Sequence, residues 1–209
     1  MAIDDIYDEH EQGERVRDWL RRNFLGLLAG IGLGLVLIFG WQYWQKYQQG
    51  QRVQAGTGFQ AVVDTIAAGN LEQAQSLAAS LEVDTYRVLA ALALAKAQVA
   101  AGDIDAATAT LRGAASSDPA LDPVRRQRLA LLLVEAGQAE QAVELLAGSQ
   151  EPAALESLGD AHVALDQRDQ AREAYASALD RIGADAPQRR VLELKLIDAG
   201  GQPAQPGTT

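Results

Sequence analysis

The order of hydrophobic and polar residues divides the chain into a polar leader, a long apolar run and a region of alternating character. No residue between Arg22 and Lys46 is charged, and residues 24–41 read FLGLLAGIGLGLVLIFGW. A helix over this stretch is about 27 Å long, close to the ~30 Å hydrocarbon core of a bilayer. The pattern predicts a leader at 1–22, a transmembrane helix at 23–45 and a folded region after it.

The ends of the apolar run favour a membrane anchor over a buried core helix or a cleaved signal peptide. Trp19, Trp41 and Trp44 all lie beside the run, as expected for residues at the two interfaces of a bilayer. A signal peptide has a short basic leader and a shorter apolar stretch. This leader is longer and rich in acids, so we expect the span to be retained.

The basic residues next to the apolar run predict its orientation. Four arginines precede it, whereas Lys46 and Arg52 follow it. Lys and Arg resist translocation, which predicts a cytoplasmic N-terminus. In a bacterial inner membrane the region 46–199 would then be a periplasmic domain.

A short motif recurs four times beyond the apolar run. AGNLEQA (68–74), AGDIDAA (101–107), AGQAEQA (136–142) and LDQRDQA (165–171) align on a final alanine, with spacings of 33, 35 and 29 residues. Alanine and leucine dominate between the motifs, and the prolines lie at boundaries, which favours helices. The spacing and the glycine turns resemble tetratricopeptide repeats, whose unit is about 34 residues. The resemblance implies an all-α solenoid of helical hairpins.

The repeats differ in how well they match this pattern. The second unit is the most complete, and the third has room for only a short second helix before Gly148. The first unit contains Gly56 and Gly58 near its start. A final helix after Pro187 has apolar residues that would cap the solenoid, and the tail at 200–209 has nothing to bury and is expected to be disordered.

The first helices of such repeats line a concave groove, which makes their inward positions candidates for binding a peptide or a partner. Counting along the repeats gives Leu89, Leu92, Lys96, Val99, Gln127, Leu131, Val134, Glu135, Glu156 and Asp160, with Val124, Ala153 and Val163 beside them. The lining is mostly aliphatic, and Lys96 is its only cation. It suits an extended or unfolded polypeptide segment, or a partner helix. The alternative is that these aliphatic residues serve packing between repeats.

The charge and residue inventory argues against several other functions. The net charge is −10, and the dense groups of basic residues beyond the span, Arg125, Arg126 and Arg128 with Arg189 and Arg190, are expected to be solvated helix faces, which disfavours nucleic-acid binding. The chain has no cysteine, and its histidines are His10 and His162. We therefore predict no catalytic residue, no metal site and no cofactor, and a structural role for His162.

Three glycines in the apolar run are spaced for helix packing. Gly26, Gly30 and Gly34 are four residues apart, so they share one face of the predicted helix. Such a face allows close approach of a second membrane helix. The partner can be another copy of the chain, giving a homo-oligomer, or a different membrane protein.

The whole arrangement resembles the YfgM-like ancillary subunits of the bacterial SecYEG translocon. The resemblance is carried by the acidic leader DDIYDEHEQGERVRDWLRRN, the glycine-rich span ending in GWQYWQKYQ, the Ala-rich repeats and the terminal VLELKLIDAG. It implies a non-enzymatic inner-membrane adaptor that meets newly exported unfolded polypeptides and cooperates with PpiD-like periplasmic chaperones.

Two other functional classes remain open at the level of sequence. A self-associating membrane scaffold, for envelope assembly or cell division, would use the glycine face as its seam. A hydrolase or metalloenzyme is disfavoured by the residue inventory.

Overall fold

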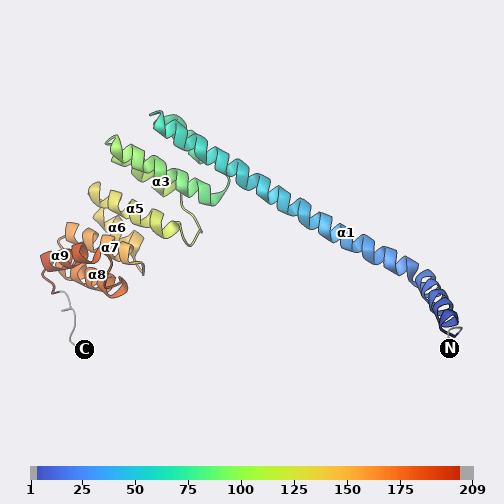
Figure 1. Ribbon diagram of the computed structural model, residues 1–209. Helices are drawn as coiled ribbons and strands as arrows, with labels where there is room; N and C mark the ends of the chain where they lie inside the picture. Colours follow the sequence, from blue (N-terminus) through green and yellow to red (C-terminus); the bar gives the residue numbers. More distant parts are fainter. Residues whose placement is uncertain (1–3, 203–209) are drawn as a thin grey trace, which may run out of the picture. The chain divides into compact units, whose positions relative to one another are not determined.

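The computed structural model describes residues 4–202 (Figure 1). These residues are helical, with no strand among them, and they form α1 (Asp4–Ala67), α2 (Leu71–Ala79), α3 (Asp84–Ala100), α4 (Ile104–Gly113), α5 (Asp122–Glu135), α6 (Ala139–Leu146), α7 (Pro152–Ala164), α8 (Arg168–Arg181) and α9 (Arg189–Asp198). The chain divides into two compact units, Met1–Val53 and Gln54–Thr209. Most of the tail predicted to be disordered, residues 203–209, lies outside the described residues.

The first unit contains one helix segment long and apolar enough to cross a membrane. This segment, Trp19–Tyr47, belongs to α1 and includes the predicted span at 23–45. Its large apolar side chains are exposed, and the rings of Trp41 and Trp44 lie 5.4 Å apart near its end. An exposed apolar surface of this length calls for an apolar solvent or a partner.

The second unit is built of helical hairpins that follow one another in chain order. α3 packs against α4, α5 against α6, and α7 against α8, and each hairpin contacts the next. The first hairpin is made by the end of α1 with α2, joined by a cluster around Val62, Ala74 and Leu94. Gly58 lies so close to Leu81 that a Cβ there would meet the leucine side chain at 2.8 Å. The two early glycines are therefore helical positions beside neighbouring side chains.

The turns between the paired helices use left-handed backbone, as the repeated motif predicts. Gly69, Gly102 and Gly137 have φ of 79°, 82° and 71°, a region that costs glycine little. The fourth turn has Asp166 at the same place, with φ of 55°. The turn geometry is thus kept where the glycine is absent.

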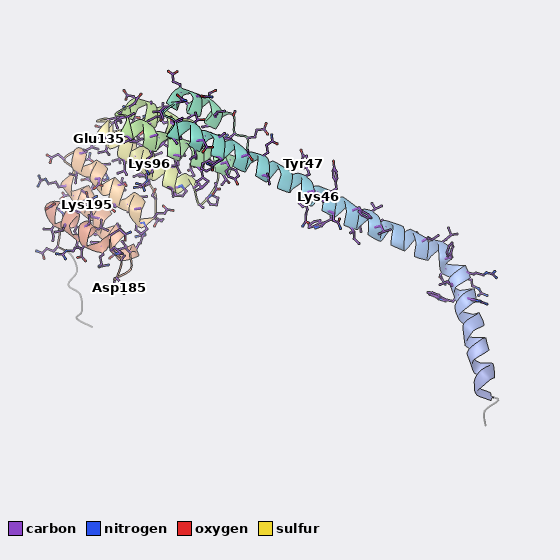
Figure 2. The ribbon with its side chains drawn as sticks, turned by 45° about the horizontal axis from the view of Figure 1, so that its top comes forward. Lys46, Tyr47, Lys96, Glu135, Asp185 and Lys195 are labelled. Carbon is purple, nitrogen blue, oxygen red and sulfur yellow. The ribbon has the colours of Figure 1, made fainter. Side chains whose placement is uncertain are left out.

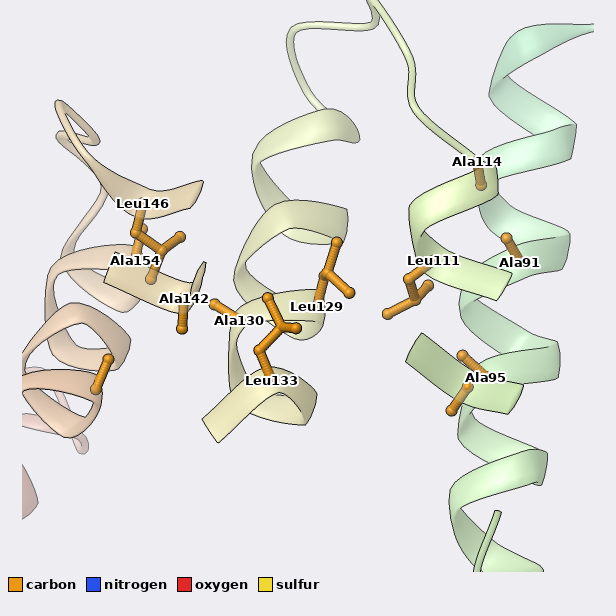
Figure 3. Packing of buried hydrophobic residues seen from close by; sticks show 12 residues of the cluster. Ala91, Ala95, Leu111, Ala114, Leu129, Ala130, Leu133, Ala142, Leu146 and Ala154 are labelled. Atoms are coloured by element: carbon orange, nitrogen blue, oxygen red, sulfur yellow. The ribbon is translucent and has the colours of Figure 1, made fainter. Parts of the chain in front are cut away.

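The core of the second unit consists mainly of alanine and leucine. One cluster joins α3–α7, and Figure 3 shows Ala91, Ala95, Leu111 and Leu129 within it. Fully buried alanines such as Ala107 allow the helices to pack closely, because they have no side chain beyond Cβ. At Gly159 even a Cβ would be too large, since it would lie 2.3 Å from the buried ring of Tyr175.

Two further features predicted from the sequence are also present: a short second helix in the third unit and a final helix that covers the end of the solenoid. The short second helix of the third unit is α6, with 8 residues. The final helix, α9, buries Leu192 and Leu196 against α8. Its opposite side leaves Val191 and Leu194 more than half exposed.

Candidate functional site

An open apolar groove lies between α3 and α5. Its volume is about 570 Å³, and its lining is formed by Leu92, Ala95, Lys96, Val99, Leu111, Val124, Arg128, Leu131 and Leu132. Ala95 and Leu111 also belong to the buried core, with 3% and 1% of their surface exposed. The bottom of the groove is therefore rigid core, and its sides are the faces of two helices.

Helical periodicity explains why these residues meet. On α3, Leu92, Lys96 and Val99 are spaced by four and three residues, which places them on one face. On α5, Val124, Arg128 and Leu131 have the same spacing. Each helix thus contributes a row of three side chains, which are apolar, basic and apolar in that order, and the two rows border one groove.

Four of the predicted groove residues line this groove together: Leu92, Lys96, Val99 and Leu131. Val124, which the repeat pattern also placed inward, lines it as well. Arg128 was missed by the sequence reasoning, which selected the preceding residue, Gln127. A count of five residues after Pro123 would have found it, since that is one helical turn beyond Val124 and one before Leu131.

The remaining predicted positions on α3 and α5 lie elsewhere. Gln127 donates a hydrogen bond to Ser157 Oγ of α7 at 2.9 Å. Val134 is partly buried against the core cluster, and neither Leu89 nor Glu135 lines the groove. Gln127 and Val134 therefore take part in packing between repeats.

Glu156 and Asp160 of α7 are engaged by α9. Lys195 Nζ donates to Glu156 Oε1 at 2.7 Å and to Asp160 Oδ1 and Oδ2 at 2.9 and 2.8 Å (Figure 2 labels Lys195). The hydroxyl of Tyr175 donates to Asp160 Oδ1 at 2.7 Å. Both carboxylates are therefore already bound by side chains of the protein itself.

Burial and charge shift the pKa values of the two donors in this network. Partial burial alone would lower the pKa of Lys195, but its hydrogen bonds to Asp160 and Glu156 outweigh that effect and raise it. The pKa of Tyr175 is raised strongly, first by burial and then by its hydrogen bond to Asp160. Both groups stay protonated at neutral pH, which keeps the network intact.

The residues suited to catalysis or metal binding do not converge. His162 Nδ1 lies 2.7 Å from Gln167 Oε1, in the turn that follows α7. Among the residues that the structure describes, no three His, Cys, Asp or Glu side chains are placed to hold a metal ion. His162 thus contacts a turn residue of its own hairpin.

The glycine face of the apolar helix is open. At Gly26, Gly30 and Gly34, an added Cβ would have no atom within 4 Å outside the helix itself. These residues lie in the candidate span, Trp19–Tyr47. Packing of a second membrane helix on this face stays a prediction.

Comparisons with known proteins identify a matching domain family and two similar proteins. A family model for a tetratricopeptide repeat-like domain matches residues 17–201. A protein of Escherichia coli (strain K12) named "Ancillary SecYEG translocon subunit" is 32% identical over 148 residues, which are 68% of this chain and 71% of that protein. A protein of the same name from Aggregatibacter actinomycetemcomitans is 26% identical over 198 residues, covering 90% of this chain and 96% of its own.

Solved structures support the fold. A Podosopora anserina protein described as a kinesin light chain, with nearly identical TPR-like repeats, superposes with a TM-score of 0.51. It is 19% identical, and the match covers 71% of this chain and 85% of that one. The predicted all-α class, with an apolar N-terminal helix followed by tetratricopeptide-like repeats, is confirmed.

Proposed function

The chain belongs to the family of ancillary SecYEG translocon subunits with a tetratricopeptide repeat-like domain, and on this basis we propose that it binds newly exported polypeptides beside the translocon. It is a membrane protein with one N-terminal apolar helix. In the proposed function it is a non-enzymatic adaptor without a cofactor. It would associate with SecYEG through its membrane-proximal part and pass clients to PpiD-like periplasmic chaperones.

The observation that carries this proposal is the apolar groove between α3 and α5. Leu92, Val99 and Leu131 present aliphatic surface there, and the groove opens to solvent. An unfolded chain exposes aliphatic side chains that would lose contact with water in such a groove. The volume, about 570 Å³, suits a few side chains of an extended segment, so binding would be weak and reversible.

The groove can be tested by adding a charge to its wall. Leu131→Asp places a carboxylate in the groove wall formed by α5 and is expected to reduce crosslinking of the full chain to a translocation-arrested polypeptide. Val134 is a poorer choice, because it packs against the core. Leu194→Asp is the matched control, since Leu194 is 55% exposed on α9, outside the groove. Equal crosslinking by both variants, with unchanged circular dichroism, would contradict the proposal.

The proposed topology has a cytoplasmic leader at 1–22, a span at 23–45 and a periplasmic domain at 46–199. It is supported by the four arginines before the span and by the aromatic residues at its ends. Because the chain has no cysteine, single cysteines can report it. Ser117→Cys should react with an impermeant maleimide in intact spheroplasts, whereas Gln12→Cys should react only after permeabilisation. The reverse pattern would refute the topology.

Self-association in the membrane is a second candidate, favoured by the open glycine face. A scaffold for envelope assembly or cell division would pack Gly26, Gly30 and Gly34 against another copy. Crosslinking in native membranes separates the candidates. Recovery of self-dimers without translocon components would favour the scaffold, and recovery of SecYEG subunits would favour the adaptor.

A further inference from the structure

We infer that the α3/α5 groove selects polypeptide segments in which an acidic side chain lies between apolar residues. This inference rests on the proposed function, because it specifies which exported segments the groove would bind. The occupant is an internal stretch of an unfolded chain, with its carboxylate between Lys96 and Arg128 and its aliphatic side chains on either side.

The first observation is that the groove contains basic side chains without protein partners. From Gln54 to Gln202, within the part of the chain that the structure describes, every Lys and Arg except Lys96, Arg128 and Arg190 has a hydrogen bond or an ion pair with the protein. Two of these three exceptions line the same groove. Their charges are therefore available to a ligand.

This availability is unusual for the domain. Acids exceed bases beyond residue 45, with 21 Asp and Glu against 14 Lys and Arg. Most other Lys and Arg side chains have a hydrogen-bond acceptor within the protein. Arg125, for example, donates to Asp122 and to the carbonyl oxygen of Leu111. A carboxylate brought to Lys96 and Arg128 would complete two charge-assisted contacts that the protein itself leaves unmade.

The second observation is the order of side chains along the two helices. Leu92 precedes Lys96 by about one turn and Val99 follows it, while Val124 precedes Arg128 and Leu131 follows it. Apolar surface thus borders the cations at both ends of the groove. A ligand that ended in a carboxylate would cover only one end, whereas an internal acidic residue with apolar neighbours covers both.

The acidic residues of the solenoid do not compete for these cations. Glu156 and Asp160 are held by Lys195, and Asp122 is held by Arg125. Glu135, at the end of α5, does not line the groove. The groove is left with a net positive charge within an acidic domain, and this charge steers acidic segments toward it.

The test measures binding of short fluorescent peptides to the full chain in detergent. The first peptide has glutamate between two leucine pairs, with both ends blocked. The second has glutamine in place of the glutamate, and the third combines that glutamine with a free C-terminal carboxylate. We expect the glutamate peptide to bind roughly five- to tenfold more tightly than the other two, as two half-exposed charge pairs would give. The preference should shrink as salt is added.

Variants assign the preference to the two cations. Lys96→Gln with Arg128→Gln should bring the glutamate peptide down to the affinity of the glutamine peptide and leave the latter unchanged. Arg190→Gln is the matched control, because it removes the third unpartnered cation outside the groove, and it should keep the full preference.

The outcomes distinguish the inference from the function on which it rests. If the wild-type chain binds glutamate and glutamine peptides equally, or if the double variant keeps the preference, the inference is overturned while peptide binding stands. Tighter binding of the third peptide would overturn it in favour of chain ends. If none of the peptides binds, and Leu131→Asp also leaves client crosslinking unchanged, the proposed function fails as well.

Discussion

Lys195 Nζ lies 2.9 and 2.8 Å from the two carboxylate oxygens of Asp160, so a single side chain of α9 ties the end of the solenoid to α7. Glu156 accepts from the same ammonium group at 2.7 Å. These side chains are 27–31% exposed, which makes the network neither a surface pair nor a fully buried one. The network helps to hold α9 in place, because this helix buries few apolar side chains.

Removal of the ammonium group should loosen this end of the domain. Lys195→Met leaves two carboxylates close together without their common cation, and we expect a loss of about 1–3 kcal/mol in the free energy of unfolding. Thermal unfolding followed by circular dichroism measures it. Arg168→Gln is the control, since the Arg168–Asp166 pair is highly exposed and should contribute little. Similar effects of both substitutions would show that the network is unimportant.

The same network predicts a loss of stability at alkaline pH. The pKa values of Lys195 and Tyr175 are raised in the folded protein, so folding favours their protonated forms. Their contribution is complete below the ordinary values near pH 10 and is lost as the pH rises through the folded values. The melting temperature should therefore decrease above about pH 10. Tyr175→Phe should weaken this decrease and remove the highest-titrating part of the tyrosinate absorbance at 295 nm.

That absorbance also provides the check. If all tyrosines of the wild-type chain titrate together near pH 10, Tyr175 is not held as described, and the alkaline decrease must have another cause.

The close contact between α7 and α8 makes Gly159 sensitive to the smallest substitution. In Gly159→Ala the new Cβ would lie 2.3 Å from Tyr175 Cε1, and the ring is 2% exposed and hydrogen-bonded at its hydroxyl. We expect a destabilisation of about 1–3 kcal/mol by overpacking. Gly113→Ala is the control, because a Cβ there meets nothing within 4 Å at an exposed helix end. It should be neutral or stabilise by up to about 1 kcal/mol. Denaturant unfolding that gives both variants the same midpoint would disprove this contact.

The fourth hairpin turn should be improved by glycine. Asp166 has φ of 55°, where the equivalent turns have glycine. Asp166→Gly relieves the left-handed strain and should raise stability by a few tenths to about 1 kcal/mol, whereas Asp166→Ala should lower it. A chemical melt of the two variants tests the sign. An order of Ala above Gly would mean that the turn is not strained.

Local chemistry allowed much of the fold to be predicted from the sequence. The turns at Gly69, Gly102 and Gly137 follow from the need for left-handed backbone between paired helices, and the repeated alanine at the end of each motif is fully buried, as at Ala107. Even the shortened α6 is visible as the small distance from Gln141 to Gly148. These features depend on neighbours within one hairpin.

The site was predicted less well, because it depends on contacts between hairpins. The choice of Gln127 instead of Arg128 is an error of one position, and on a helix one position changes the direction of a side chain by about 100°. Gln127 points to Ser157, which is 30 residues away in sequence. Likewise, no residue near Glu156 or Asp160 in the sequence indicates that Lys195 forms ion pairs with both carboxylates.

The small side chain of Ala95 has a consequence for how the groove can change. Ala95 belongs both to the lining of the groove and to the core beneath it, so the spacing of α3 and α5 depends on a residue that has no rotamers to adjust. A larger side chain there would have to push the helices apart or project into the floor of the groove, and either change would reshape the groove without altering the residues on its rim. Selectivity for bulkier or slimmer segments could therefore diverge among descendants of this chain through a substitution at the floor of the groove, while Lys96, Arg128 and the apolar residues on the rim stay the same.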